Sequence, residues 1–284
     1  MYKRQALILL GIGVVILCLV PLTWILPVYV IGHRWKFLSA ESIRNTHWGL
    51  KSVWFVGAGA LIASFVSLLN DVEYLNSILS LEDYEGVYDV ATEGFSVLIF
   101  ILLFGLFILL ACRKIDWSIV GPKDWSWGES ILYAILYFIA YKIVIGVYYS
   151  FLIKGLGIPH DEIYSIAHPF MSNREDIDAL VITYGTFAGF FLVAVFVPFV
   201  EEIAFRGIYL DGIKRYINFP VANFLQALIF ATVHWSLMLF PVFLLFGLIC
   251  GFLRKNSNGL MTGIIFHMIN NLAAMSVLIA QLPE

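Results

Sequence analysis

The amino-acid sequence predicts an all-α protein, a polytopic transmembrane bundle of about eight helices. Of its 284 residues, 61% are hydrophobic and only 13% are charged, and the mean hydropathy is +0.90. Soluble domains have about 45–50% apolar and about 25% charged residues, so this composition indicates a multi-pass membrane protein. The net charge of -3, without a basic cluster, gives no sign of nucleic-acid binding.

Apolar runs long enough to cross a bilayer define the expected helices. The first run, 6–31, follows Lys3 and Arg4, but no small-x-small cleavage site comes after it. We therefore expect a retained helix and not a removed signal peptide. The further candidates are 51–69, 94–112, 129–153, 179–212, 219–236, 238–253 and 259–281. We divide the chain into N-terminal helices and linkers, 1–178, and a helix core with the polar motifs, 179–284.

The distribution of basic residues predicts the orientation of the bundle. Eleven of the seventeen lysines and arginines lie in four linkers, if Lys51 is counted with the first: 32–50, 113–128, 213–218 and 254–258. Linker 70–93 has no basic residue and seven acidic ones. The four basic linkers lie on one side of an eight-helix count, so that side should be the cytoplasm, with both termini outside. Lys3 and Arg4 disagree with this assignment, because N-terminal positive charges usually stay inside.

Two glutamates and an arginine interrupt the fifth apolar run, where burying an ion within the membrane has a high free-energy cost. Glu202 and Arg206 are i and i+4, so on a helix they share a face and can neutralise each other. Glu201 is turned by about 100° and has no partner within its own helix. Another helix, or a water-filled cavity, must therefore stabilise Glu201.

Helix rise predicts which polar residues meet within the membrane. Counted from the cytoplasmic surface at about 1.5 Å per residue, Glu201 lies about 20 Å deep and His234 about 22 Å deep. On the last helix His267 and Asn271 are i and i+4, at about 12 and 18 Å. Three antiparallel helices should thus bring Glu201, Glu202, Arg206, His234, His267 and Asn271 together.

Several of these residues also have a structural explanation. His234 or His267 alone can equally be a core residue bonded to a backbone carbonyl, but the whole set, with an unpaired glutamate, favours a functional site. Asn270 points off the His267 face and is better explained as a packing donor. Lys142 can neutralise a site carboxylate or pair elsewhere. We expect three glycines to let helix backbones and lipid tails come close together at a lateral entrance for the substrate: Gly247, Gly251 and Gly263.

The order Glu201-Glu202-x-x-x-Arg206, Phe230-x-x-x-His234 and His267-x-x-x-Asn271 resembles the signature of the CAAX protease and bacteriocin-processing (Abi) family of intramembrane proteases. The resemblance covers about 198–276. It implies a hydrolase of the plasma membrane of a bacterium, an endopeptidase that cuts membrane-associated peptides or lipid-anchored proteins near the cytoplasmic leaflet. Eukaryotic members remove the last three residues of prenylated CAAX proteins; bacterial relatives are associated with bacteriocin maturation or immunity.

Peptide hydrolysis needs a nucleophile, a proton carrier and a stabiliser of the oxyanion. No Ser or Cys nucleophile motif lies on these helices, so water should attack, held between Glu201 and His234, with Glu201 as base. His267 and Asn271 would then face the oxyanion, a division of roles that the resemblance also implies. Arg206 would balance Glu202 or bind a substrate carboxylate.

Three alternatives stay open at this point. Glu201, His234 and His267 are a possible zinc ligand set, with Glu202 as base, so the cofactor is either none or a divalent metal such as Zn²⁺. The protein can instead be a non-catalytic immunity or scaffold protein that binds a membrane peptide. It can also be a proton-coupled transporter that uses Glu201, although no inverted repeat is evident.

The charge distribution predicts that 70–93 faces outward and that 32–50, 113–128 and 213–218 face the cytoplasm. A Glu82→Cys variant, in a background without the three native cysteines, should react with an impermeant thiol reagent added to intact cells. A cysteine in linker 213–218 should react only after the membrane is opened. The reverse labelling pattern would show that the orientation is inverted.

Overall fold

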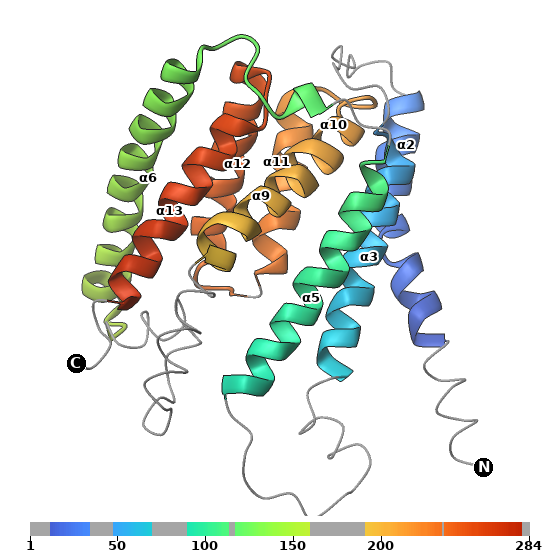
Figure 1. Cartoon of the computed structure of the whole chain (residues 1–284), viewed down its shortest axis with the longest axis horizontal. Coiled ribbons are helices and arrows are strands. Elements are labelled where there is room, and N and C mark those ends of the chain that lie inside the picture. Colours follow the sequence, from blue (N-terminus) through green and yellow to red (C-terminus); the bar gives the residue numbers. More distant parts are fainter. Residues whose placement is uncertain are drawn as a thin grey trace, which may run out of the picture. The chain divides into compact units, whose positions relative to one another are not determined.

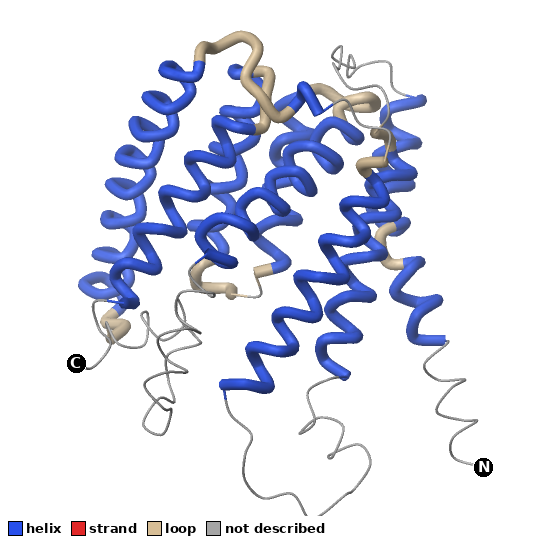
Figure 2. Tube along the Cα trace, in the orientation of Figure 1, coloured by secondary structure: helices blue, strands red, loops and turns tan. Residues whose placement is uncertain are grey.

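The computed structural model describes residues 12–34, 48–69, 90–113, 117–159, 191–234 and 236–279, and these contain helices and no strand (Figures 1 and 2). The α-helices are α2 (Leu22–Arg34), α3 (Leu50–Leu69), α5 (Val90–Ala111), α6 (Trp127–Leu156), α9 (Val197–Glu202), α10 (Leu210–Ile213), α11 (Phe219–Val233), α12 (Phe240–Ser257) and α13 (Met261–Ile279). A 3₁₀ turn, η1, spans Trp117–Ile119, and two π-helical segments, η3 (Leu192–Phe196) and η4 (Ile203–Tyr209), flank α9. The all-α prediction is confirmed for the described chain.

Each predicted apolar segment contains a helix in its described part, although a turn at 20–21 interrupts the first segment and several helix ends differ by a few residues. Residues 6–11 and 179–190, and the linker stretches 70–89 and 160–178, lie outside the described residues. Within the described part, two helices are long and apolar enough to cross a membrane, Trp127–Leu156 and Phe240–Ser257. The number of spans, eight, stays a prediction.

Contacts divide the chain into two compact units, Met1–Ile115 with Asp211–Asn218 and Asp116–Leu210 with Phe219–Glu284. In the first unit α3 packs on α5, with the Phe55 and Phe107 rings 5.3 Å apart. The Trp48 indole donates to the carbonyl of Ala111, 3.3 Å away, and so ties the start of α3 to the end of α5. The polar motifs all belong to the second unit.

Helix α6 of the second unit has the surface of a lipid-facing helix. Ser126 caps its start: the hydroxyl accepts from the Glu129 N–H, and the Glu129 carboxylate accepts from the Ser126 N–H. One side of α6 packs on α13 (Figure 1). Its exposed large apolar side chains are mostly aliphatic, with aromatic ones nearer the ends: Trp127, Ile131, Leu132, Tyr133, Ile135, Leu136, Ile139, Ile143, Val144, Val147, Phe151 and Leu156. A continuous apolar surface of this length suits a bilayer and not water.

A tight turn joins α12 to α13, as the Asn258-Gly259 pair indicates. Asn258 adopts the left-handed conformation, with φ 51°. The backbone of 119–124 binds this turn: the Lys123 N–H donates to the carbonyl of Ser257, and the Leu260 N–H donates to the carbonyl of Ile119. These bonds set the start of α13, the helix that carries His267.

The protein's own atoms occupy the space beside the three glycines expected at a lateral entrance: Gly247 lets two backbones approach, as expected, but none of the three leaves room for a lipid tail. A Cβ on Gly247 would lie 2.8 Å from both Cα and Cβ of Ala227. On Gly251 it would clash with the Asn223 amide, and on Gly263 it would lie 2.8 Å from Glu202 Oε2. The missing side chains serve close contact between helices and leave no gap for a lipid tail.

We expect Gly247→Ala to destabilise the α11–α12 contact, because the new methyl group meets backbone atoms that cannot move without shifting a helix. Overpacking of this kind costs about 1–3 kcal/mol. Thermal unfolding of the purified protein in detergent should show a lower melting temperature. Gly146→Ala is the matched control, since its Cβ meets no atom within 4 Å; equal melting temperatures for the two variants would contradict the packing assignment.

Candidate active site

The two adjacent glutamates lie on α9, a short helix between two π-helical segments. Segments of π-helix are rare and occur often at functional sites. The predicted i, i+4 pair is formed: Arg206 Nη1 lies 3.0 Å from Glu202 Oε1, and both side chains are fully buried. The guanidinium carbon also lies 4.5 Å from the centre of the Phe230 ring. Arg206 therefore balances Glu202 within the bundle.

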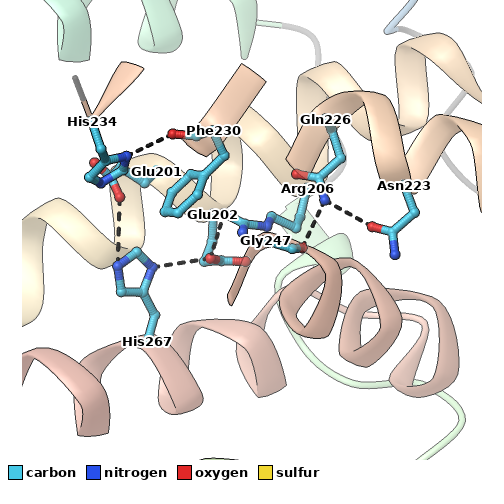
Figure 3. Close-up of polar contacts among 9 residues, drawn as sticks. All are labelled: Glu201, Glu202, Arg206, Asn223, Gln226, Phe230, His234, Gly247 and His267. Carbon is cyan, nitrogen blue, oxygen red and sulfur yellow. Dashed lines mark hydrogen bonds and ion pairs between the residues drawn. The ribbon is translucent and has the colours of Figure 1, made fainter. Parts of the chain in front are cut away.

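Both glutamates approach the same histidine (Figure 3). His267 Nδ1 lies 3.1 Å from Glu202 Oε1, and its Nε2 lies 3.6 Å from Glu201 Oε2. A carboxylate can only accept, so Nδ1 carries a proton and donates it to Glu202. Glu202 thus fixes the ring so that Nε2 faces Glu201, at a distance longer than a hydrogen bond.

His234 lies one residue beyond the end of α11, which stops at Val233 and not, as expected, at residue 236. Its Nδ1 lies 2.7 Å from the carbonyl of Phe230, one turn earlier, and must donate to it. A histidine that binds a terminal carbonyl in this way caps a helix, which explains the early end. In the neutral ring Nε2 is then left as an acceptor. The ring stacks on Phe243 at 4.0 Å.

Phe230 connects the motifs physically. Its ring centre lies 4.5 Å from that of His234, 6.2 Å from that of His267 and 5.1 Å from that of Phe205. With the Arg206 guanidinium over it, one aromatic ring contacts residues of all three motifs. The sequence places Phe230 four residues before His234, and this spacing was the available signal for a shared face.

Asn271 lies on α13 one turn after His267, as predicted, but its hydrogen bonds point elsewhere. Its amide Nδ2 donates to the carbonyl of Val193 in η3, 2.9 Å away. Asn270 donates to Asn271 Oδ1 at 3.3 Å, so it orients its neighbour. Asn271 therefore holds α13 against the π-helical segment and keeps one N–H that this bond does not use.

Comparison with protein families matches residues 183–273 to the Rce1-like model, described as type II CAAX prenyl endopeptidase Rce1-like. This segment is similar to an Rce1-like domain. It contains all six predicted site residues, in agreement with the resemblance derived from the motifs. Comparisons with curated proteins and with solved structures give no match.

The sequence leaves open a metal site formed by Glu201, His234 and His267. Among the described residues, no group of three His, Cys, Asp or Glu side chains is arranged to hold a metal ion. In the metal alternative Glu202 would act as the base, but its carboxylate is paired with Arg206 and His267. We therefore derive no step through a metal, and whether one is required stays a prediction.

Lys142 stands apart from the site of the Rce1-like domain. Its Nζ lies 5.4 Å from the centre of the Phe138 ring and 5.8 Å from that of Tyr141. No ion pair joins Lys142 to a carboxylate in the described part of the chain. Its amine therefore contacts rings of its own helix, α6.

We expect Glu202→Gln to destabilise the protein, because it leaves the fully buried Arg206 guanidinium without its counter-charge. Removing one member of such a pair costs about 3–5 kcal/mol. The double variant Glu202→Gln with Arg206→Met removes both charges and should recover part of the loss. Thermal unfolding in detergent measures this, with Glu129→Gln, which keeps the helix cap, as control. A double variant less stable than Glu202→Gln alone would contradict the role of Arg206.

Proposed function

We propose that the protein is a multi-pass intramembrane endopeptidase that hydrolyses membrane-associated or lipid-anchored peptides near the cytoplasmic leaflet of a bacterial plasma membrane. The observation that supports it best is the difference between the two adjacent glutamates. The Glu202 side chain is 1% exposed and paired with Arg206, whereas that of Glu201 is 21% exposed and has no arginine or lysine partner among the described residues. Glu201 is thus a carboxylate that water can reach.

The catalytic cycle follows from the proton positions. A water between Glu201 and His234 Nε2 gives a proton to Glu201 while its oxygen attacks the peptide carbonyl carbon. The carbonyl oxygen becomes an oxyanion. As the C–N bond breaks, the proton passes from Glu201 to the leaving amine. The products are a carboxylic acid and an amine, so the atoms of one water are accounted for.

His267 and Asn271 are the proposed groups that face the oxyanion. Because Nδ1–H of His267 is directed at Glu202, the ring can face an oxyanion only through an N–H on Nε2, the atom that lies 3.6 Å from Glu201 Oε2. A donor that is held in place before the reaction stabilises an oxyanion without reorganisation. Asn271, held through Val193, can turn its remaining N–H toward the same oxygen.

The test compares two substrates with the purified protein in lipid vesicles. One peptide carries a prenyl or acyl chain, and the other has the same sequence without it. The anchored peptide should be cleaved much faster, because anchoring concentrates it at the membrane. Glu201→Gln and His234→Ala should each lower kcat by about 10²–10⁴-fold, the loss expected for general-base catalysis.

The controls separate this mechanism from its alternatives. Glu129→Gln makes the same chemical change outside the site and should cleave at the wild-type rate. A chelator should leave the rate unchanged; loss of activity that zinc restores would favour the metal alternative. Near-normal cleavage by Glu201→Gln would refute its role as base. Protection of cells against a bacteriocin by the Glu201→Gln variant, without cleavage, would instead indicate an immunity or scaffold protein.

A further inference from the structure

Gly263 lies outside the three motifs, yet it contacts the site directly. It precedes His267 by four residues on α13, so both lie on one face of the helix. A Cβ built on Gly263 would lie 2.8 Å from Glu202 Oε2 and 3.5 Å from Glu202 Cδ. The first distance is too short for a real contact, so the Glu202 carboxylate occupies the space that a side chain would take.

The two oxygens of Glu202 are held in different ways. Oε1 is bound by Arg206 Nη1 at 3.0 Å and by His267 Nδ1 at 3.1 Å (Figure 3). Oε2 is buried and meets no hydrogen-bond donor in good geometry among the described residues, although the Cys250 side chain lies close enough to interact with Glu202. The surface on which Oε2 packs, which includes the bare Cα of Gly263, therefore helps to set its position. The absence of a side chain at Gly263 determines how closely the Glu202 carboxylate can approach the backbone of α13.

We propose that Gly263 is a positioning residue for the proposed peptidase: the notch it leaves in α13 seats Glu202, which holds Nδ1 of His267 and so presents Nε2 to Glu201. This inference rests on the proposed function. Only two contacts separate Gly263 from the His267 ring: Gly263 packs against the Glu202 carboxylate, and the carboxylate accepts from His267 Nδ1. A side chain at 263 pushes Glu202 outward, and the ring that it orients moves with it.

The displacement needed is large compared with what the site tolerates. Moving Oε2 from 2.8 Å to an ordinary contact of about 3.4–4 Å from a methyl carbon shifts it by several tenths of an ångström or more. A misplacement of about 1 Å at a reacting group can lower the rate by about 10²-fold, so a shift of this size should lower activity by about 10–100-fold. The effect should fall on kcat, because Gly263 has no reason to touch the substrate.

The experiment is a double-mutant cycle with Gly263→Ala and Glu202→Asp, assayed on the anchored peptide. Gly263→Ala should lower kcat by about 10–100-fold with KM little changed. Glu202→Asp shortens the side chain by one methylene and also lowers kcat. Because both changes act on one contact, the double variant should be no slower than the slower single variant. Multiplied effects, or a change confined to KM, would overturn the proposal.

Gly146→Ala is the matched control on α6. It brings the same gain in helix propensity, about 1 kcal/mol, but its Cβ meets no atom within 4 Å. It should leave kcat and the melting temperature at or above the wild-type values. A Gly263→Ala variant that behaves like Gly146→Ala would show that the notch is not needed.

Melting temperatures keep the proposal testable if Gly263→Ala folds poorly. The shorter aspartate side chain relieves the clash, so Glu202→Asp should raise the melting temperature of Gly263→Ala. No such recovery would overturn the seating of Glu202. If wild-type protein cleaves neither peptide, the proposed function fails, while this stability cycle still decides whether Gly263 seats Glu202.

Discussion

The ion pair between Glu202 and Arg206 is the interaction on which the site depends. Both side chains are fully buried, and their separation of 3.0 Å lets each charge compensate the other where hydration is lost. Glu202 is also the acceptor for His267 Nδ1 and the occupant of the notch at Gly263. One carboxylate on α9 thus contacts two other elements: η4 through Arg206, and α13 through His267 and Gly263. Without it neither the charge of Arg206 nor the orientation of His267 is defined.

Regular helix geometry explains what could be predicted from the sequence. The pair Glu202 and Arg206 needs only the i, i+4 rule. Antiparallel order brings His267 into the same zone as the glutamates, but helix rise placed it about 8 Å from the depth of Glu201 and did not predict their contact. Each apolar run contains a helix where the structure describes it. These features depend on periodicity within one segment, or on counting from a membrane surface, and both are visible in a single sequence.

The features that escaped prediction arise where the helices are irregular or touch one another. The π-helical segments on both sides of α9 have no clear sequence signal, and they place the carbonyl of Val193 where Asn271 binds it. The early end of α11 depends on a side-chain bond from His234 to its own helix. The glycines were interpreted from the sequence as space for lipid tails, whereas the space beside Gly263 is occupied by the carboxylate of Glu202 from another helix. Contacts between helices decide these details.

The charges of the site also explain why two consecutive glutamates are useful. Arg206 offers one positive charge to two adjacent carboxyl groups, and the contacts pair it with Glu202 and not with Glu201. Glu201 instead approaches His267, with Nε2 lying 3.6 Å from Glu201 Oε2. A charge that is only partly compensated at this depth needs contact with water, and the Glu201 side chain is 21% exposed. In the proposed mechanism the same requirement supplies the nucleophile, because the water that would solvate the Glu201 carboxylate is the water that it would deprotonate.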